Sequence, residues 1–570
     1  MPTSGRLKVV LCWHMHQPEY RDYSTGDYQL PWTYLHAMKD YTDMAAILEQ
    51  TPGARAVINF VPILLDQLED YAAQIRAYLA ERRPLRDPLL AALVSETFPR
   101  EAERRAPLVR ACLRANEQRL INRFPMYRRL VDLAVMMKDD TESLSYLGDQ
   151  YLADILTWYH LAWMGETVRR GDKRVQRLIE KARFFTPEDR LQLFEVIGEL
   201  VAAVVPRYRR LAESGQAELS MTPYAHPMIP LLLDFASARE AVPEMPLPAA
   251  GGYPGGLERA HWHLKEGVAA FERHFGFAPQ GCWPAEGGLS TATVLLLGDH
   301  GFRWTATGES VLRNSIARNA AIHDPCASKN LHRVYRIDAA KPACFFRDDG
   351  LSDLIGFTYQ GWHADDAVAN LVHHLENIAQ ECDGSPNHVV SIILDGENAW
   401  EAYPENGYHF LTALYHRLAE HPALELTTFS DSLSGDMEFC RLPSIIAGSW
   451  VYGTFSTWMG NPDKNRGWEL LCEAKRKCDE VLAGDTLRDE ERERIIRQLA
   501  ACEGSDWCWW FGDYNPADSV SDFERLYRLH LGNLYRLLGV EPPAILTQSI
   551  STGGGQPQLG GVMRRGSEAH

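Results

Sequence analysis

Two apolar segments that end abruptly in polar side chains constrain the fold of this chain more than any other feature. Residues 8–18, KVVLCWHMHQP, begin as a buried strand and end in two histidines before Pro18. Residues 388–397, HVVSIILDGE, repeat this pattern and end in Asp395. Apolar, β-branched runs are typical of parallel strands that are covered on both faces. The carboxyl ends of such strands are where barrel enzymes place their functional groups.

Strand and helix patterns alternate from residue 8 to about residue 430, which is typical of an α/β fold with a parallel sheet. Helical spacing of apolar residues predicts helices over 34–49, 257–275 and 367–381, between the expected strands. The simplest closed arrangement is a barrel. Besides the two segments above, strands are expected near residues 56–61, 217–221, 275–283, 301–307, 334–337, 354–357 and 424–429.

Two long stretches have helical patterns and few strand signals. The first, about 64–211, is too long for a barrel loop and too regular for disorder, so it predicts a helical insertion in a barrel unit of residues 1–435. The second, 436–545, predicts a C-terminal helical domain with helices over 466–482 and 489–502. The remaining segment, 546–570, is rich in glycine and lacks periodicity, which predicts a disordered tail.

The composition excludes several classes of partner. With 58 basic and 76 acidic residues the net charge is −18, so the chain repels nucleic acids and anionic membranes and suits a neutral ligand. No apolar stretch reaches the length of about 18 residues that spans a bilayer, and the N-terminus has no secretory pattern. The eleven cysteines form no C-x-x-C pair. This favours reduced thiols and a cytoplasmic protein, and disfavours a cysteine-rich zinc site.

Glu286 lies in the segment 281–288, GCWPAEGG, where an apolar run meets proline and glycine. A carboxylate at a strand end beside a tryptophan predicts a catalytic group, although a helix cap near Ser290 would give the same pattern. Asp395 ends a second strand at the same edge of the sheet, and it too could cap the helix that follows. We expect the two carboxylates to lie close together.

Three histidines also lie at strand ends. His14 and His16 are two positions apart and so share one face of the first strand, and His226 follows the strand at 217–221. Histidines at this spacing could bind a metal ion. They could equally donate and accept hydrogen bonds at a binding site, and the sequence shows no third metal ligand.

In combination these segments resemble glycoside hydrolase family 57, a group of retaining enzymes that act on α-glucans. The resemblance covers residues 8 to about 515. It rests on five motifs in order: His14-Met-His-Gln-Pro18, Glu218-Leu-Ser-Met with His226-Pro-Met-Ile-Pro, Trp283-Pro-Ala-Glu286, Asp395-Gly-Glu397, and the aromatic segment Gly448–Trp458. The His-Gln-Pro wording looks like that of the amylase, amylopullulanase and 4-α-glucanotransferase members. Asn461-Pro-Asp-Lys-Asn465 and Asp506-Trp-Cys-Trp-Trp510 look like the amylase and amylopullulanase members.

The resemblance implies a (β/α)7-type barrel, with the C-terminal helical domain closing over the cleft, and chemistry without a metal or other cofactor. It implies that Glu286 is the nucleophile and Asp395 the general acid/base. The expected substrate is starch, glycogen or a malto-oligosaccharide, cleaved at α-1,4 bonds, with α-1,6 bonds as a second candidate. The expected substrate-binding residues are His14, His16, Gln17, His226, Trp283, Glu397, Trp400, Trp450, Trp458, Asp506 and Trp507.

Three alternatives stay open at this point. A 4-α-glucanotransferase would share the same residues and differ only in whether water or a sugar accepts the glycosyl group. A metal-dependent deacetylase or mannosidase on a related barrel would use His14 and His16 as ligands. A non-catalytic glucan-binding protein would keep the barrel without turnover.

Overall fold

The fold is built around a closed barrel of parallel strands. The structure, a computed structural model, describes residues 5–137, 142–319, 331–382, 385, 387–435, 437–484 and 487–555. Within these residues, seven strands pair in parallel and in turn, and the pairing of the last with the first closes the ring. The seven are β1 (Leu7–Met15), β2 (Ala56–Phe60), β3 (Ala217–Met221), β4 (Gly281–Cys282), β5 (Trp304–Gly308), β7 (Ala343–Arg347) and β8 (Val389–Asp395). The predicted (β/α)7-type barrel is confirmed.

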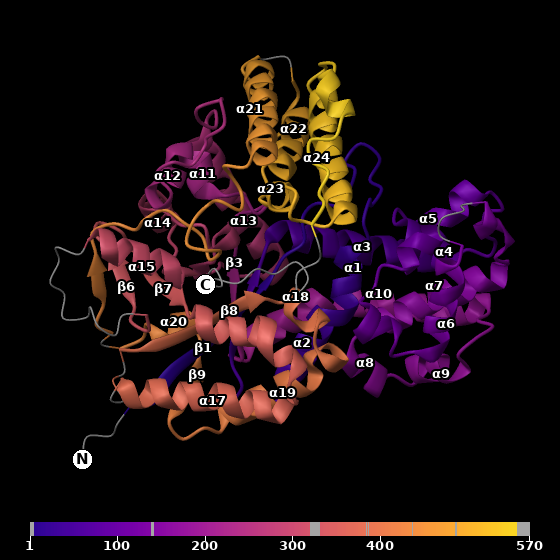
Figure 1. Cartoon of the computed structure of the whole chain (residues 1–570), viewed down its shortest axis with the longest axis horizontal. Coiled ribbons are helices and arrows are strands. Elements are labelled where there is room, and N and C mark those ends of the chain that lie inside the picture. Colours follow the sequence, from indigo (N-terminus) through magenta and orange to yellow (C-terminus); the bar gives the residue numbers. More distant parts are fainter. Residues whose placement is uncertain are drawn as a thin grey trace.

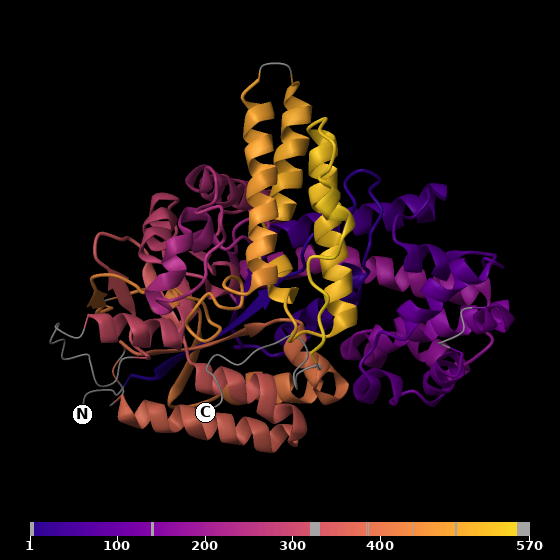
Figure 2. The ribbon, with the colours of Figure 1, turned by 45° about the horizontal axis from the view of Figure 1, so that its top comes forward.

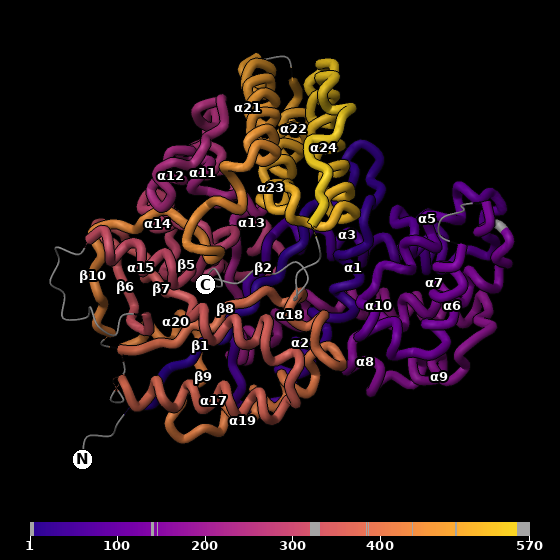
Figure 3. The backbone as a smooth tube through the Cα atoms, viewed as in Figure 1, coloured from indigo at the N-terminus to yellow at the C-terminus, as the bar shows by residue number. Residues whose placement is uncertain are grey.

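Three short strands extend this sheet. β6 (Tyr335–Ile337) runs antiparallel to β7, β10 (Cys440–Leu442) pairs with β6, and β9 (Leu424–Thr427) pairs with the first half of β1. Figure 3 follows the chain and shows that β1 and β8, which are far apart in sequence, run side by side.

One expected strand is absent, and one strand of the barrel was missed. Residues 354–357, expected as a strand, belong to the π-helical turn Leu354–Thr358, which continues the helix α16 (Asp349–Asp353). Asp348 caps α16 by accepting a hydrogen bond from the Leu351 N–H, so the chain enters this apolar run already helical. The barrel strand is instead β7, which the sequence analysis missed. Short apolar runs do not distinguish the two structures by periodicity alone.

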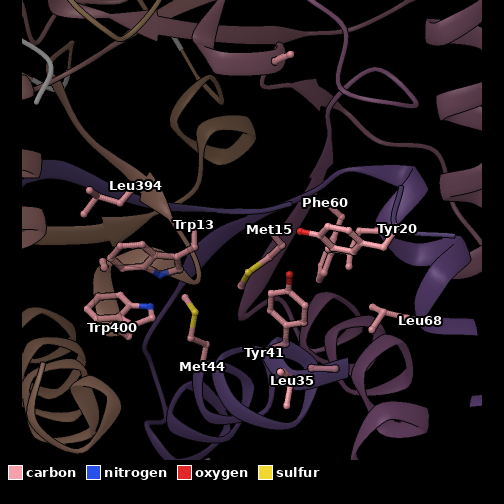
Figure 4. Close-up of a cluster of buried hydrophobic side chains, with 14 of the residues drawn as sticks. Trp13, Met15, Tyr20, Leu35, Tyr41, Met44, Phe60, Leu68, Leu394 and Trp400 are labelled. Atoms are coloured by element: carbon pink, nitrogen blue, oxygen red, sulfur yellow. The ribbon is translucent and has the colours of Figure 1, made fainter. Parts of the chain in front are cut away.

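The two faces of β1 bury different surroundings. Val10 and Cys12 point into the barrel, where they pack with buried residues of the other strands. Val9, Leu11, Trp13 and Met15 belong to the larger core between the barrel and its helices. Figure 4 shows Trp13 and Met15 among side chains of this outer core. The alternation of side chains along a strand therefore leaves His14, next after Cys12 on the inner face, at the open end of the barrel.

A helical lobe extends to one side of the barrel, as the sequence predicts (right side of Figure 1). It runs from α3 (Pro62–Glu81) to α10 (Pro187–Glu213) and includes α4 (Pro88–Val94), α5 (Ala102–Cys112), α6 (Pro125–Val135), α7 (Asp149–Trp163), α8 (Glu166–Gly171) and α9 (Lys173–Lys181). The first and last helices of the lobe pack against each other. Thr186 and Asp189 form a capping box that starts α10.

Other helices cover the barrel itself. The first crossover contains α1 (Trp32–His36), a π-helical turn and α2 (Thr42–Gln50). Four further helices are α13 (Gly256–Phe275), α15 (Glu309–Arg318), α17 (Ala364–Glu381) and α19 (Tyr408–Ala419). Shorter helices in this part are α11 (Ile229–Leu233), α12 (Ala238–Ala241), α14 (Thr291–Asp299), α18 (Asn398–Glu401) and α20 (Phe429–Ser432).

The C-terminal helices form a bundle that stands on the barrel. The long helices α21 (Pro462–Leu482), α22 (Asp489–Cys502) and α24 (Ala517–Leu537) lie side by side, and the short α23 (Asp506–Trp510) lies at their base (Figure 2). None of the helices in the described part of the chain is long and apolar enough to cross a membrane.

The expectation of a disordered tail from residue 546 needs correction. Residues 546–555 are described and pack on the bundle, where Ser551 is buried and its Oγ accepts a hydrogen bond from the Gly512 N–H. The backbone N–H groups of Gly554 and Gly555 donate to the Asn515 carbonyl. Residues 556–570 lie outside the described residues.

Candidate active site

A cavity of about 260 Å³ opens at the carboxyl ends of the barrel strands. Its walls include the ends of β1 and β8, the loops after β3 and β4, and the C-terminal region around residues 450 and 506–510, all distant from one another in sequence. Both candidate carboxylates line it. So do six further predicted residues, His14, His16, Gln17, His226, Glu397 and Asp506, together with Trp450.

Glu286 stands in the tight turn that follows β4. Its backbone φ is 57°, a left-handed conformation that costs energy for any residue except glycine. The C-terminal region holds it from three directions. The Trp450 backbone N–H donates to the Glu286 carbonyl (3.1 Å), the Trp450 indole donates to Oε2 (3.3 Å), and the Ser505 hydroxyl donates to Oε1 (3.0 Å).

The surroundings of Glu286 oppose its ionisation. Burial raises its pKa to about 8, and the negative charges of Asp395 and Asp506 act in the same direction. Only 12% of the side chain is exposed. The hydrogen bonds from Ser505 and Trp450 act in the opposite direction, because they stabilise the carboxylate. Burial and the two neighbouring charges thus favour the protonated form of Glu286, and its two hydrogen-bond donors favour the ionised form.

Asp395 is the last residue of β8 and lies opposite His14 in the strand register. Its Oδ2 accepts one hydrogen bond, from the Asn398 side-chain amide at 3.1 Å. Burial raises its pKa, and the bond from Asn398 and the nearby His16 and Arg347 lower it by less. Asp395 therefore has fewer side-chain donors than Glu286.

The three predicted histidines meet in one cluster beside Glu286. The Nε2 atoms of His14 and His226 are 3.1 Å apart, and the rings of His16 and His226 stack with their centroids 3.8 Å apart. His14 and His226 are buried, with exposed fractions of 3% and 1%. Burial, together with the neighbouring histidines, lowers the pKa of both, to about 3 for His14.

One group of possible metal ligands lies within this cluster. Ligand atoms of His16, His226 and Asp506 all lie within 4.8 Å of one another. The stacked rings of His16 and His226 are only 20° from parallel. Imidazole lone pairs lie in the ring plane, so lone pairs of two rings stacked face to face point side by side and do not converge on one ion. In addition, His16 Nε2 already bonds Asp506 Oδ1 at 2.7 Å. This geometry fits hydrogen bonding better than metal binding.

Glu397 and Gln17 support the strand exits. Glu397 Oε1 accepts hydrogen bonds from the Tyr41 hydroxyl and from the His16 backbone N–H, the latter at 2.8 Å. Burial raises the pKa of Glu397 well above its ordinary value. The Tyr20 hydroxyl donates to Gln17 Oε1 at 2.9 Å. These contacts fix the segment that carries His16.

Comparison with known proteins identifies the family. The sequence profile of glycosyl hydrolase family 57 matches residues 10–441. The chain belongs to this family, and it is an enzyme of that class. No curated protein sequence matches the chain.

Several solved structures share the fold. A branching enzyme of Thermococcus kodakaraensis, in complex with glucose, superposes with a TM-score of 0.56 at 15% identity, covering 94% of this chain and 90% of that one. An α-amylase of Thermotoga maritima gives 0.57 at 15% identity, with coverage of 94% and 93%. A 4-α-glucanotransferase of Thermococcus litoralis gives 0.50 at 12% identity, with coverage of 93% and 60%.

The aromatic wall of this family 57 site differs from the expected one. Four tryptophans expected to stack on sugar are buried in the core and do not line the cavity: Trp283, Trp400, Trp458 and Trp507. Trp283 instead packs edge-on beneath Trp450, with ring centroids 5.2 Å apart. The tryptophans that line the cavity are partly buried, and they are Trp32, Trp450, Trp509 and Trp510.

Three further residues of the site escaped the sequence analysis. Ser505 bonds Glu286 and immediately precedes Asp506, so the aromatic motif at 506–510 marked its neighbourhood but not its role. Asn59, near the end of β2, bonds His14. Arg347 ends the missed strand β7, lines the cavity and donates to the Ile393 carbonyl at 2.8 Å. Neither Asn59 nor Arg347 lies in a motif with a chemical signature.

Proposed function

We propose that this protein cleaves α-1,4-glucans with retention of configuration, through a covalent glycosyl-enzyme. In this proposal Glu286 is the nucleophile and Asp395 the general acid and base. The observation that carries it is the pair of buried carboxyl groups beside one cavity, which differ in their hydrogen-bond donors. Glu286 receives two side-chain donors, whereas Asp395 receives one.

The proposed reaction has two steps. Glu286 attacks the anomeric carbon while Asp395 gives its proton to the leaving glycosidic oxygen. Asp395, now ionised, then removes a proton from water, which attacks the glycosyl-enzyme and releases the sugar. Retaining enzymes hold two such carboxyl groups about 5–5.5 Å apart. The effect of the Asp395 charge on the pKa of Glu286 supports close proximity of the two.

An α-glucan suits the walls of the cavity. Sugars present hydroxyl groups to polar side chains and apolar faces to aromatic rings, and this cavity offers His16, Asp506 and Arg347 together with several tryptophans. The negative net charge of the chain also favours a neutral substrate. The structural neighbours named above are a branching enzyme, an amylase and a glucanotransferase, and all three names fit an α-glucan.

Transfer to a sugar acceptor is the second candidate. It uses the same glycosyl-enzyme and replaces water by a sugar hydroxyl in the second step. Two observations support transferase activity as the second candidate: the similarity to the 4-α-glucanotransferase, and the aromatic residues Trp509 and Trp510 in the cavity wall. The product distribution separates the two activities.

The test is a product analysis with a defined malto-oligosaccharide. Hydrolysis yields only shorter products with new reducing ends, whereas transfer yields longer and shorter products with the number of reducing ends unchanged. The α anomer of the first product, followed by proton NMR, identifies retention. We expect Glu286→Gln to lose activity by a factor on the order of 10⁴. Glu425→Gln, an exposed carboxylate on β9, serves as the matched control.

Asp395→Asn separates the acid role from a general loss of folding. Because an aryl leaving group needs little protonation, we expect an activated aryl α-maltoside to keep most of its first-step rate, while the natural substrate loses about 10²–10⁴-fold. Equal losses on both substrates would remove Asp395 from the acid role. Full activity of Glu286→Gln would remove Glu286 from the nucleophile role.

A further inference from the structure

A continuous chain of hydrogen bonds leads from Glu286 into the barrel core. Ser505 Oγ is 3.0 Å from Glu286 Oε1 and 2.8 Å from His226 Nδ1. His226 Nε2 is 3.1 Å from His14 Nε2, and His14 Nδ1 is 2.7 Å from Asn59 Oδ1. Every member beyond Glu286 is buried, with at most 3% of its surface exposed. These hydrogen-bonded groups are therefore almost entirely shielded from bulk water.

Asn59, at the far end of this row of hydrogen bonds, determines which ring nitrogens of His14 and His226 carry a hydrogen. Asn59 donates its side-chain amide to Ser220 Oγ at 3.0 Å, which turns its oxygen towards His14. An amide oxygen only accepts, so His14 carries a hydrogen on Nδ1 and its Nε2 bears a lone pair. The facing Nε2 of His226 must then carry the hydrogen between the two rings, because two lone pairs 3.1 Å apart would repel.

Two proton arrangements satisfy every bond without moving a heavy atom. In the first, protonated Glu286 donates to Ser505, and Ser505 donates to His226 Nδ1. In the second, His226 Nδ1 donates to Ser505, and Ser505 donates to ionised Glu286. The second arrangement leaves one positive charge on the His14–His226 pair and one negative charge on Glu286. His226 Nδ1 and Glu286 Oε1 are 3.9 Å apart, within the range of an ion pair.

We propose that Ser505 and the His14–His226 pair form a proton relay that ionises Glu286 for its attack on the sugar. The proposal rests on the role of Glu286 as nucleophile. The O–H bond of Glu286 breaks as Ser505 Oγ takes the proton, and the O–H bond of Ser505 breaks as its hydrogen passes to His226 Nδ1. One proton moves at each link, and the total charge of the chain stays the same. Ser505, His226 and His14 are thus positioning residues that act through Glu286.

The relay explains how the buried nucleophile can become ionised. A lone carboxylate in this site is disfavoured by burial and by the charges of Asp395 and Asp506, which raise its pKa to about 8. Burial likewise disfavours a lone cationic histidine, and it lowers the pKa of His226. Transfer along the chain creates both charges together, so each stabilises the other. Positive charge that develops on the sugar during its attack favours the ionised form further.

Other charged groups also lie beside this row of hydrogen bonds and affect the ionisation of Glu286 and His226. His16 stacks on His226, and Asp506 bonds His16. Asp395 and Arg347 line the same cavity as Glu286. A pH profile of the wild-type enzyme therefore contains their contributions as well. The test therefore compares variants of Ser505 alone, so that these neighbouring groups stay the same.

The first experiment measures the pH dependence of kcat/KM for hydrolysis of a malto-oligosaccharide. Ser505→Ala breaks the chain, so we expect the acid limb of the profile to move about one unit to higher pH and kcat to fall about tenfold or more with little change in KM. Ser505→Thr keeps the hydroxyl and should restore much of the wild-type profile. Ser315→Ala removes another buried hydroxyl, on α15, and controls for loss of packing. An unchanged profile in Ser505→Ala would overturn the relay.

The second experiment needs no turnover. Infrared spectra identify the protonated carboxyl band that Glu286→Gln removes, and ¹⁵N NMR of labelled histidine follows His226, assigned with His226→Gln. In the wild type both signals should change over the same pH interval, and in Ser505→Ala the two midpoints should separate. If the carboxyl and histidine midpoints coincide in Ser505→Ala as they do in the wild type, the relay is overturned. Coupled signals in a protein that cleaves no glucan would instead overturn the proposed function and leave the relay intact.

Discussion

Two residues of the site have backbone conformations that side chains rarely adopt. Glu286 has φ 57° and His226 has φ 59°. Each costs on the order of 1–3 kcal/mol and persists only where the surroundings fix it. Here the fixing contacts come from the C-terminal region, because the Trp450 N–H bonds the Glu286 carbonyl and the Ser505 N–H bonds the His226 carbonyl at 2.9 Å. The strain aims both side chains into one cavity.

The raised pKa of Glu286 predicts a pH-dependent stability difference. Because its pKa is about 8 in the folded protein and about 4.3 in the unfolded chain, the folded state binds the extra proton between these values. The free energy of unfolding that this group contributes is greatest below the unfolded value and declines as the pH rises through the folded one. We expect Glu286→Gln to gain melting temperature relative to the wild type as the pH rises from about 4.5 to 8. A constant difference across this range, measured by thermal unfolding, would contradict the raised pKa.

At the scale of elements, the site is built where strands end. β1 and β8 pair in register so that His14 lies opposite Asp395, and the alternation of side chains turns His14 towards the open end of the barrel. The sequence pattern alone predicts only that both residues lie at one edge of the sheet. The sequence pattern does not predict the position of the helical lobe. The role of the lobe depends on where it meets the cavity.

The helical lobe meets the C-terminal bundle at the edge of the active-site cavity. Arg114, which follows α5 in the lobe, pairs with Asp522 of α24 at 2.5 Å and lies over the ring of Trp32 at 5.4 Å. Arg114 and Trp32 line both the active-site cavity and a neighbouring cavity of about 270 Å³. The second cavity therefore adjoins the first, and we predict that it holds the more distant sugars of a long chain.

We accordingly predict that Arg114→Ala selectively affects long substrates. Loss of the cation that orders Trp32 should cost about 1 kcal/mol of binding, which is roughly a fivefold decrease in kcat/KM for a long malto-oligosaccharide. A short one, held in the catalytic cavity alone, should be cleaved as before. Arg104→Ala, on the exposed face of α5, is the control. Equal losses for long and short substrates would argue against an extended binding cleft.

At the scale of the molecule, one buried carboxylate joins the bundle to the barrel. Glu503, at the end of α22, is fully buried and accepts hydrogen bonds from Arg259 and His263 of α13, at 2.7 Å in each case, and from Tyr253 at 2.5 Å. Burial opposes its ionisation, but the positive charge of Arg259 and the bond from His263 outweigh burial and hold its pKa well below the usual range. Ser505 and Asp506 follow directly, so this network also anchors the segment that completes the site.

Glu503→Gln should destabilise the whole protein. It leaves Arg259 buried without its counter-ion, which typically costs about 3–5 kcal/mol in the free energy of unfolding. Glu493→Gln, on the exposed face of the same helix, should change it by at most about 1 kcal/mol. Chemical unfolding followed by tryptophan fluorescence measures both.

The same variant should change the response to acid. Because the folded pKa of Glu503 is depressed, its contribution to stability is present above the unfolded value of about 4.3 and is lost as the pH falls through the folded one. The variant should therefore lose less stability than the wild type on acidification. Equal acid sensitivity of the two proteins would show that Glu503 does not carry this charge in the folded state.

The sequence by itself determined the barrel and the residues at its strand ends. Apolar runs that stop at His14 and Asp395 carry local information, because a buried strand must be apolar along its length and a functional edge must be polar. The long helices α10, α21 and α22 were equally readable, since periodicity over many residues is a strong signal. Short elements such as β7 were not.

Only the tertiary structure decided which aromatic and polar side chains complete the site. Trp283 and Trp458 resemble Trp450 in sequence, yet they are buried and Trp450 lines the cavity, because exposure depends on what the rest of the chain packs against each ring. The same holds for the contacts of Ser505 with Glu286 and His226. Hydrogen bonds between residues so far apart in the chain leave no local pattern, since each partner is fixed by the packing of the bundle on the barrel.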